Sequence, residues 1–149
     1  MIAVQFTENC AGRDFDLAEI EKLVKSICGR FDIESAGINI ELMGDSQIRE
    51  LNVRFLDRDT TTDVISFDLS EKGVDKESFD LAINAEMAVN QAELRGHSGQ
   101  AELALYVTHG LLHHLGFNDD TPANAQKMHE TEDEILKQFG YGVVYDKRC

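Results

Sequence analysis

Cysteine and proline are scarce in this chain, and a long apolar run is absent from its sequence. Its 149 residues include three widely spaced cysteines, with no CxxC pair, and one proline, Pro122. This cysteine usage fits neither a disulfide framework nor a thiolate metal site, and it is typical of a reducing compartment. No stretch reaches about 18 consecutive apolar residues, and the first ten residues contain no basic leader or signal-like apolar core. We therefore expect a cytoplasmic protein with no membrane span.

Positive charge is scarce as well. Lysine and arginine number 14 against 28 acidic residues, which gives a formal net charge of −14. This balance argues against a broad basic face that neutralises phosphate backbones. A small cationic cleft is compatible with it, because Arg49, Arg54 and Arg58 recur within one short segment. Elsewhere the acidic excess is typical of a solvated, highly soluble surface.

The chain has the size and pattern of one domain. With 42% hydrophobic residues and no repeat or Ser/Gly-rich linker, residues 1–149 are expected to share a single core. Alternating apolar residues predict strands, and apolar residues at helical spacing predict helices. The expected class is α/β (α+β), a small mixed sheet of about four strands covered by about five helices. The strands are expected at IAVQF, GINIELM, TTDVISFDL and DLAIN, and the helices at about 15–31, 45–55, 85–94, 98–115 and 121–139.

Polar residues and glycines mark the ends of these helices. Asp14 or Asp16, then Asp45, Ser98 and Thr121, stand where side-chain oxygens cap helix N-termini. Pro122 follows the last of these caps, at the first helical position, which proline favours. Glycines at 96 and 116 are expected to end the two helices that precede them.

Three of the five histidines lie within HGLLHHLGFNDD, residues 109–120. His109 and His113 are four residues apart, so a helix would point both rings into one cleft at a separation suited to one metal ion. Gly116 permits a left-handed turn after them, and the returning chain could supply a third ligand from residues 118–120. Catalytic zinc commonly takes three His and carboxylate ligands and one water. The alternative is two partly buried histidines that make only core hydrogen bonds.

The neighbouring residues narrow this interpretation. His114 lies about 100° further round the helix, so it is expected on another surface. His129, on the next helix, is equally compatible with approaching the site or with exposure to solvent. Zinc peptidases carry HExxH, in which the glutamate is the general base. Gly110 occupies the position of that glutamate, which argues against a conventional zinc peptidase.

Other segments form motifs together with this histidine pair. They are HGLLH and GFND at 109–119, Leu51-Asn52 with Arg54, TDVISF at 62–67, DLAIN at 80–84, His97-Ser98 with Glu102, and Met128 with Glu132. Together they resemble the YbeY family of bacterial endoribonucleases, known as rRNA maturation factors. The corresponding family motifs are HGxLHLxGYDH, LNxxYRxxDxPTDVLSF, GDIxI and MxxxE. The resemblance covers most of the chain from about residue 37 onward, with several motifs in the same order.

The resemblance implies a set of three metal ligands, and this chain departs from the family motifs at several positions. The family binds its metal through H-x3-H-x5-H, and counting from His109 and His113 reaches Asp119 in place of the third histidine. Thr61 replaces the motif proline, and Phe79 replaces the glycine of GDI. The expected cofactor is one Zn²⁺ ion. A carboxylate ligand at Asp119 also shifts the preference towards harder metals such as Mn²⁺.

The same resemblance predicts the function. We expect a metal-dependent endoribonuclease that acts on single strands, matures the 3′ end of 16S ribosomal RNA and supports ribosome biogenesis and quality control. His113 and Arg54 are the expected catalytic residues, since a metal ion and a guanidinium together stabilise the charge of phosphodiester cleavage. Asp63 and Ser66 are expected either to orient substrate or to satisfy local hydrogen bonds.

The expected partners are ribosomal RNA and the small ribosomal subunit, with basic ribosomal proteins as a further option for the acidic surface. Two other functions stay open. One is a non-catalytic ribosome-associated factor with a structural metal, and the other is a metal hydrolase of small phosphodiesters. The sequence determines neither the cleavage position nor the oligomeric state, and the motifs give the N-terminal third no role.

Overall fold

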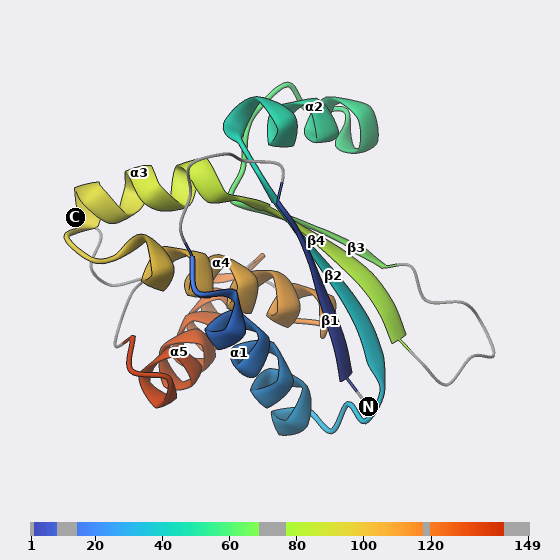
Figure 1. The fold of residues 1–149 in the computed structure, drawn as a ribbon, viewed down its shortest axis with the longest axis vertical. Coiled ribbons are helices and arrows are strands. Elements are labelled where there is room, and N and C mark those ends of the chain that lie inside the picture. Colours follow the sequence, from blue (N-terminus) through green and yellow to red (C-terminus); the bar gives the residue numbers. More distant parts are fainter. Residues whose placement is uncertain (1, 9–14, 69–76, 118–119, 142–149) are drawn as a thin grey trace.

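A mixed four-stranded sheet organises the residues that the computed structural model describes, which are 2–8, 15–68, 77–117 and 120–141. The strand order is β1 (Ile2–Glu8), β2 (Ala36–Met43), β4 (Glu77–Asn84) and β3 (Val64–Asp68). β1, β2 and β4 run parallel, while β3 lies antiparallel to β4 along one edge (Figure 1).

The five helices of the described chain cover the sheet unequally. α1 (Leu17–Arg30), α4 (Gly99–His114) and α5 (Pro122–Gln138) lie on one side, and α2 (Asp45–Leu56) lies apart from them (Figure 1). Side chains alternate between the faces of a strand. Accordingly Leu81 and Ile83 join the main core, whereas Ala82 and its partner Ile65 pack in a second, smaller core with residues of α2.

α4 is the central helix because its sequence is apolar on every side. All residues from 101 to 108 are buried, including Glu102 and Thr108. Such a helix is stable only when other elements surround it. α3 (Ala85–Arg95) leads into it, and the turn between them contains Gly96 in the left-handed conformation (φ 74°).

The predicted fold class, strand number and helix number are confirmed. Asp16, Ser98 and Thr121 cap α1, α4 and α5 as predicted, each accepting a hydrogen bond from a backbone N–H three residues later. None of the helices in the described ranges is long and apolar enough to cross a bilayer.

Two local predictions were wrong, for related reasons. The N-cap of α2 is Gly44, whose N–H donates to the Gln47 side chain, rather than Asp45. The Asp45 carboxylate instead accepts hydrogen bonds from Thr61 (2.8 Å) and from the buried Asn84 (3.0 Å). These bonds hold residues 61–63 in a loop, so β3 begins at Val64 and not at Thr61.

Candidate functional site

The last turn of α4 brings two imidazole rings together. The Nε2 atoms of His109 and His113 lie 3.0 Å apart, and their ring centroids are separated by 4.5 Å at an interplanar angle of 80°. Both residues are partly buried. The four-residue spacing therefore places both rings in one site, as one helical turn requires.

A buried carboxylate orients this pair. Glu132 on α5 has no exposed surface, and its Oε2 lies 2.8 Å from Nδ1 of His109. Its Oε1 lies 2.8 Å from Nδ1 of His129, so His129 approaches the site through this carboxylate. When His109 donates its Nδ1–H to Glu132, its Nε2 lone pair is left facing His113. This is the arrangement by which carboxylates fix the tautomer of metal-binding histidines.

The two Nε2 atoms fit two positions of a metal site. Tetrahedral ligands at ~2.0–2.1 Å from zinc lie ~3.3–3.4 Å from one another, close to the observed separation of 3.0 Å. Within the described ranges, no group of three His, Cys, Asp or Glu side chains converges on one point. Asp119, the expected third ligand, and Asn118 both lie outside the described residues. Asp120 is exposed, and its carboxylate accepts a hydrogen bond from Asn124 (2.8 Å).

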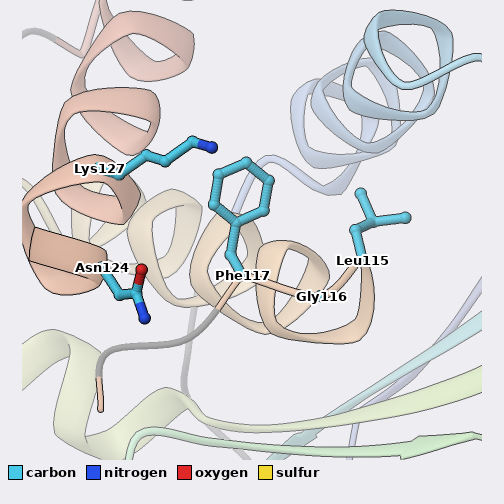
Figure 2. A pocket seen from close by; sticks show the side chains of 5 residues that line it. All are labelled: Leu115, Gly116, Phe117, Asn124 and Lys127. Carbon is cyan, nitrogen blue, oxygen red and sulfur yellow. The ribbon is translucent and has the colours of Figure 1, made fainter. Parts of the chain in front are cut away.

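The turn after α4 is fixed by packing. Gly116 has φ 103°, and the Phe117 N–H donates to the Leu112 carbonyl (2.9 Å). The Phe117 ring contacts Phe31 edge to face, and Lys127 lies 5.8 Å from its centroid. Figure 2 shows Phe117 and Lys127 at a hollow of about 180 Å³ between this turn and α5. Residue 117 thus leaves the helix from an anchored position.

Two hollows flank the histidines. The first, which we call the His113 groove, has a volume of about 720 Å³ and lies between the end of α2, residues 60–62, the start of β3 and α4. The second, the His109 pocket, has a volume of about 350 Å³ and includes Glu132 and Arg95 in its wall. Thr62 lines both hollows, so the histidine pair sits where they adjoin.

Of the three predicted substrate-binding residues, Asp63 and Ser66 line the hollows beside the histidines, and Arg54 does not. Ser66 lines the His113 groove, and Asp63 lines the His109 pocket. Asp63 also makes local hydrogen bonds, because its Oδ1 accepts from the Val64 N–H at 2.8 Å and from the Thr62 hydroxyl at 3.2 Å. Both of its expected roles are therefore compatible with its position.

Arg54 lines neither hollow. Its side chain is 63% exposed, and its guanidinium lies 3.2 Å from the Glu50 carboxylate, one helical turn earlier. Counted from Leu51-Asn52, the arginine of the family motif LNxxYR corresponds to Leu56 in this chain. The arginine in the groove wall is Arg58.

Sequence reasoning gave no role to a buried ionic cluster beside the His109 pocket. Glu102 has no exposed surface, and its Oε1 lies 2.7 Å from both the Arg95 guanidinium and Nε2 of His97. Burial raises the pKa of the Tyr106 hydroxyl far above its ordinary value of 10, and the Glu102 carboxylate raises it further. The signal in the sequence was a glutamate within an apolar helix, since a buried carboxylate requires partners.

Gly110 explains why α4 can lie so close to the sheet. A Cβ at this position would lie 2.9 Å from Val64 Cγ2 and 3.1 Å from Leu81 Cδ2. Even a methyl group is therefore crowded here, and a larger side chain would require Val64 or Leu81 to shift. This helix–sheet contact favours glycine over the glutamate of HExxH, in agreement with the argument against a zinc peptidase.

Known proteins are similar to this chain in sequence, and a solved structure is similar to it in fold. A relative from Macrococcus caseolyticus is 34% identical, with 94% of this chain and 97% of that protein covered, and one from Moorella thermoacetica is 38% identical, with 70% and 74% covered. Both are named Endoribonuclease YbeY. The solution structure of a Thermotoga maritima protein has the same fold, with a TM-score of 0.61, 23% identity and coverage of 93% and 89%. The model of the family Endoribonuclease YbeY matches residues 5–140, and the chain therefore belongs to this family.

Proposed function

We propose that this protein is a metal-dependent endoribonuclease that cleaves single-stranded RNA and matures the 3′ end of 16S ribosomal RNA. Family membership supports an endoribonuclease. The observation that carries the proposal is the pair of converging Nε2 atoms beside the His113 groove, with one ring oriented by buried Glu132. The groove has the volume of a site for a small ligand, which suits one or two nucleotides of an unpaired strand.

The proposed ligands of one Zn²⁺ ion are His109, His113 and Asp119, and the carboxylate of Asp119 also suits Mn²⁺. A bound ion would supply Lewis acidity that activates water and offsets charge on the cleaved phosphate. The residues of the chain itself orient a ligand and line the space for the substrate. Glu132 holds the His109 ring by its Nδ1–H, and Asp63 and Ser66 line the two hollows that flank the histidines.

The proposed partners are ribosomal RNA and the small ribosomal subunit, which implies action in the cytoplasm. A formal net charge of −14 disfavours strong binding to RNA through the surface as a whole. It favours contact with basic ribosomal proteins. Delivery by such proteins would bring a single-stranded rRNA end to a local site without a broad basic face.

The test is cleavage of 3′-extended small-subunit rRNA, presented in ribosomal particles, by metal-loaded protein. His113→Ala is expected to abolish cleavage, because it removes one of the two convergent nitrogens. His114→Ala is the matched control, since His114 is adjacent in sequence but lines neither hollow. We expect this control to cleave like the unchanged protein.

Each alternative result has a distinct meaning. Full cleavage by His113→Ala would refute a catalytic role for the histidine pair. Absence of cleavage by the unchanged protein, with the particle still bound, would identify a non-catalytic ribosome-associated factor. Turnover of simple phosphodiesters without affinity for RNA would identify a hydrolase of small substrates.

A further inference from the structure

Arg58 differs from the other arginines of the described ranges in its lack of an ion pair. The structure describes five arginines, and four of them lie within 4.0 Å of a carboxylate. Arg58 makes no such contact with any described residue, although the chain carries twice as many acidic as basic residues. The four paired residues are Arg30, Arg49, Arg54 and Arg95.

The guanidinium of Arg58 belongs to the wall of the His113 groove. Arg58 and His113 both line this hollow, one from the segment after α2 and the other from α4. Its backbone position is fixed rather than free. Asp57 ends α2 in the left-handed conformation (φ 55°), and the Arg58 N–H donates to the Asn52 carbonyl at 3.1 Å.

Asn52 fixes the segment on both sides of Arg58. Its side chain is buried, and its Nδ2 donates to the Thr60 carbonyl at 2.7 Å. One asparagine therefore contacts the backbone at residue 58 and again at residue 60. The backbone that carries this cation is therefore already in place, so only the side chain has to be ordered when it binds an anion.

An exposed aromatic side chain lines the same groove. Phe55 lies three residues before Arg58, and 57% of its surface is exposed. Proteins bind single-stranded nucleic acids by stacking bases on aromatic rings and by placing cations along the backbone. Arginine suits the second task because its planar guanidinium donates two parallel hydrogen bonds to a phosphate.

We propose that Arg58 binds a backbone phosphate of single-stranded RNA in the His113 groove while Phe55 stacks on a neighbouring base. This subsite rests on the proposed endoribonuclease function and assigns the phosphate contact to Arg58 instead of Arg54. The reason is geometric, since Arg54 is paired with Glu50 and lies outside the groove, whereas Arg58 lines the groove and has no ion pair with a residue that the structure describes.

The test is equilibrium binding of a fluorescein-labelled, single-stranded 2′-O-methyl oligoribonucleotide to zinc-loaded protein, followed by anisotropy between about 50 and 200 mM salt. Loss of one phosphate contact on a single strand lowers the slope of log K against log salt by about 0.7. Arg58→Ala is expected to show this change and about tenfold weaker binding. Arg58→Lys should restore the slope but only part of the affinity, because lysine keeps the charge and lacks the planar fork.

Two further variants separate base stacking from the phosphate contact and control for the loss of one positive charge. Phe55→Ala is expected to weaken binding about tenfold at every salt concentration without changing the slope, because stacking releases no counterions. Lys22→Ala is the charge-matched control, since it also removes one positive charge, and Lys22 is 70% exposed on α1. It should bind like the unchanged protein. Unchanged thermal unfolding midpoints would show that the variants are folded.

Equal slopes and affinities for Arg58→Ala, Lys22→Ala and the unchanged protein would overturn the assignment of Arg58. Unchanged affinity of Phe55→Ala would overturn the stacking contact. In both cases binding and cleavage by the unchanged protein would leave the proposed function standing. If the unchanged protein neither binds nor cleaves RNA, the proposed function fails and the subsite fails with it.

Discussion

The Oε2 atom of Glu132 lies 2.8 Å from Nδ1 of His109, although the two residues are 23 positions apart and come from different helices. The second oxygen of this buried carboxylate bonds His129 at the same distance. Each oxygen therefore accepts from one imidazole, and the tautomer and orientation of the His109 ring depend on a residue that does not face the groove.

Glu132→Gln should weaken zinc binding about 10- to 100-fold, as for other carboxylates that support metal-binding histidines. A glutamine has one acceptor oxygen where glutamate has two, so one of the two histidines loses its acceptor. Zinc affinity would be measured by competition with a chelating dye. Glu130→Gln is the matched control, since Glu130 is exposed on the same helix and accepts a hydrogen bond from Gln126, away from the histidines. Equal zinc affinity of both variants would show that Glu132 does not support a metal ligand.

The features of the site and fold that the sequence could predict depend on residues close together in the chain. The shared face of His109 and His113 follows from the helical repeat alone, and the caps at Ser98 and Thr121 are equally local. The pairing of Arg54 was also visible in the sequence, because Glu50 stands four residues before it. A glutamate at that spacing predicts an ion pair along the helix surface, which the structure contains.

The remaining features depend on packing between distant segments. Glu132 reaches His109 only because α5 packs against α4. Asn52 fixes the position of Arg58 through a left-handed conformation at Asp57, which non-glycine residues adopt uncommonly, although aspartate adopts it more often than most. Neither the periodicity nor the composition of the sequence contains this information.

Gly110→Ala should destabilise the protein by about 1–3 kcal/mol, the usual cost of an added methyl group in a packed core. Its Cβ would lie 2.9 Å from Val64 Cγ2, at the contact between α4 and β3. Gly29→Ala is the control, because a Cβ at this helical position meets no described atom within 4 Å beyond its chain neighbours and its own helix backbone. It should stabilise the protein by about 0.5–1 kcal/mol.

Urea unfolding at neutral pH measures both effects. Opposite signs for the two substitutions are expected, because both replace glycine by alanine within a helix, but only the Cβ at residue 110 is crowded by side chains of the sheet. A stabilised Gly110→Ala variant would mean that Val64 and Leu81 yield without cost.

The free energy of unfolding should decrease less at alkaline pH in the Tyr106→Phe variant than in the unchanged protein. Burial raises the pKa of the Tyr106 hydroxyl, so above pH ~10 the unfolded chain releases this proton while the folded protein retains it. The contribution of the protonated Tyr106 hydroxyl to the free energy of unfolding is fully present below pH ~10. It falls by about 1.4 kcal/mol for each pH unit above that value. Unfolding free energies of both proteins from pH 9 to 11 test this, and parallel curves would contradict it.

Asp119→Ala should weaken zinc binding strongly, whereas Asp120→Ala should not. The two residues are neighbours with identical side chains, and the Asp120 carboxylate is hydrogen-bonded to Asn124. Asp119 is instead the residue at the position of the third ligand in the family pattern. Competition with a chelating dye measures both affinities, and equal losses would remove the distinction between the two aspartates.

Asp119→His tests whether the carboxylate at residue 119 affects the choice between zinc and manganese. Imidazole and carboxylate oxygen both bind zinc, but the oxygen suits manganese better. The histidine variant is therefore expected to raise the ratio of zinc to manganese affinity relative to the unchanged protein, as titration calorimetry with each metal would show. An unchanged ratio, with zinc still bound, would mean that residue 119 does not contact the ion and that His109 and His113 are joined by another ligand.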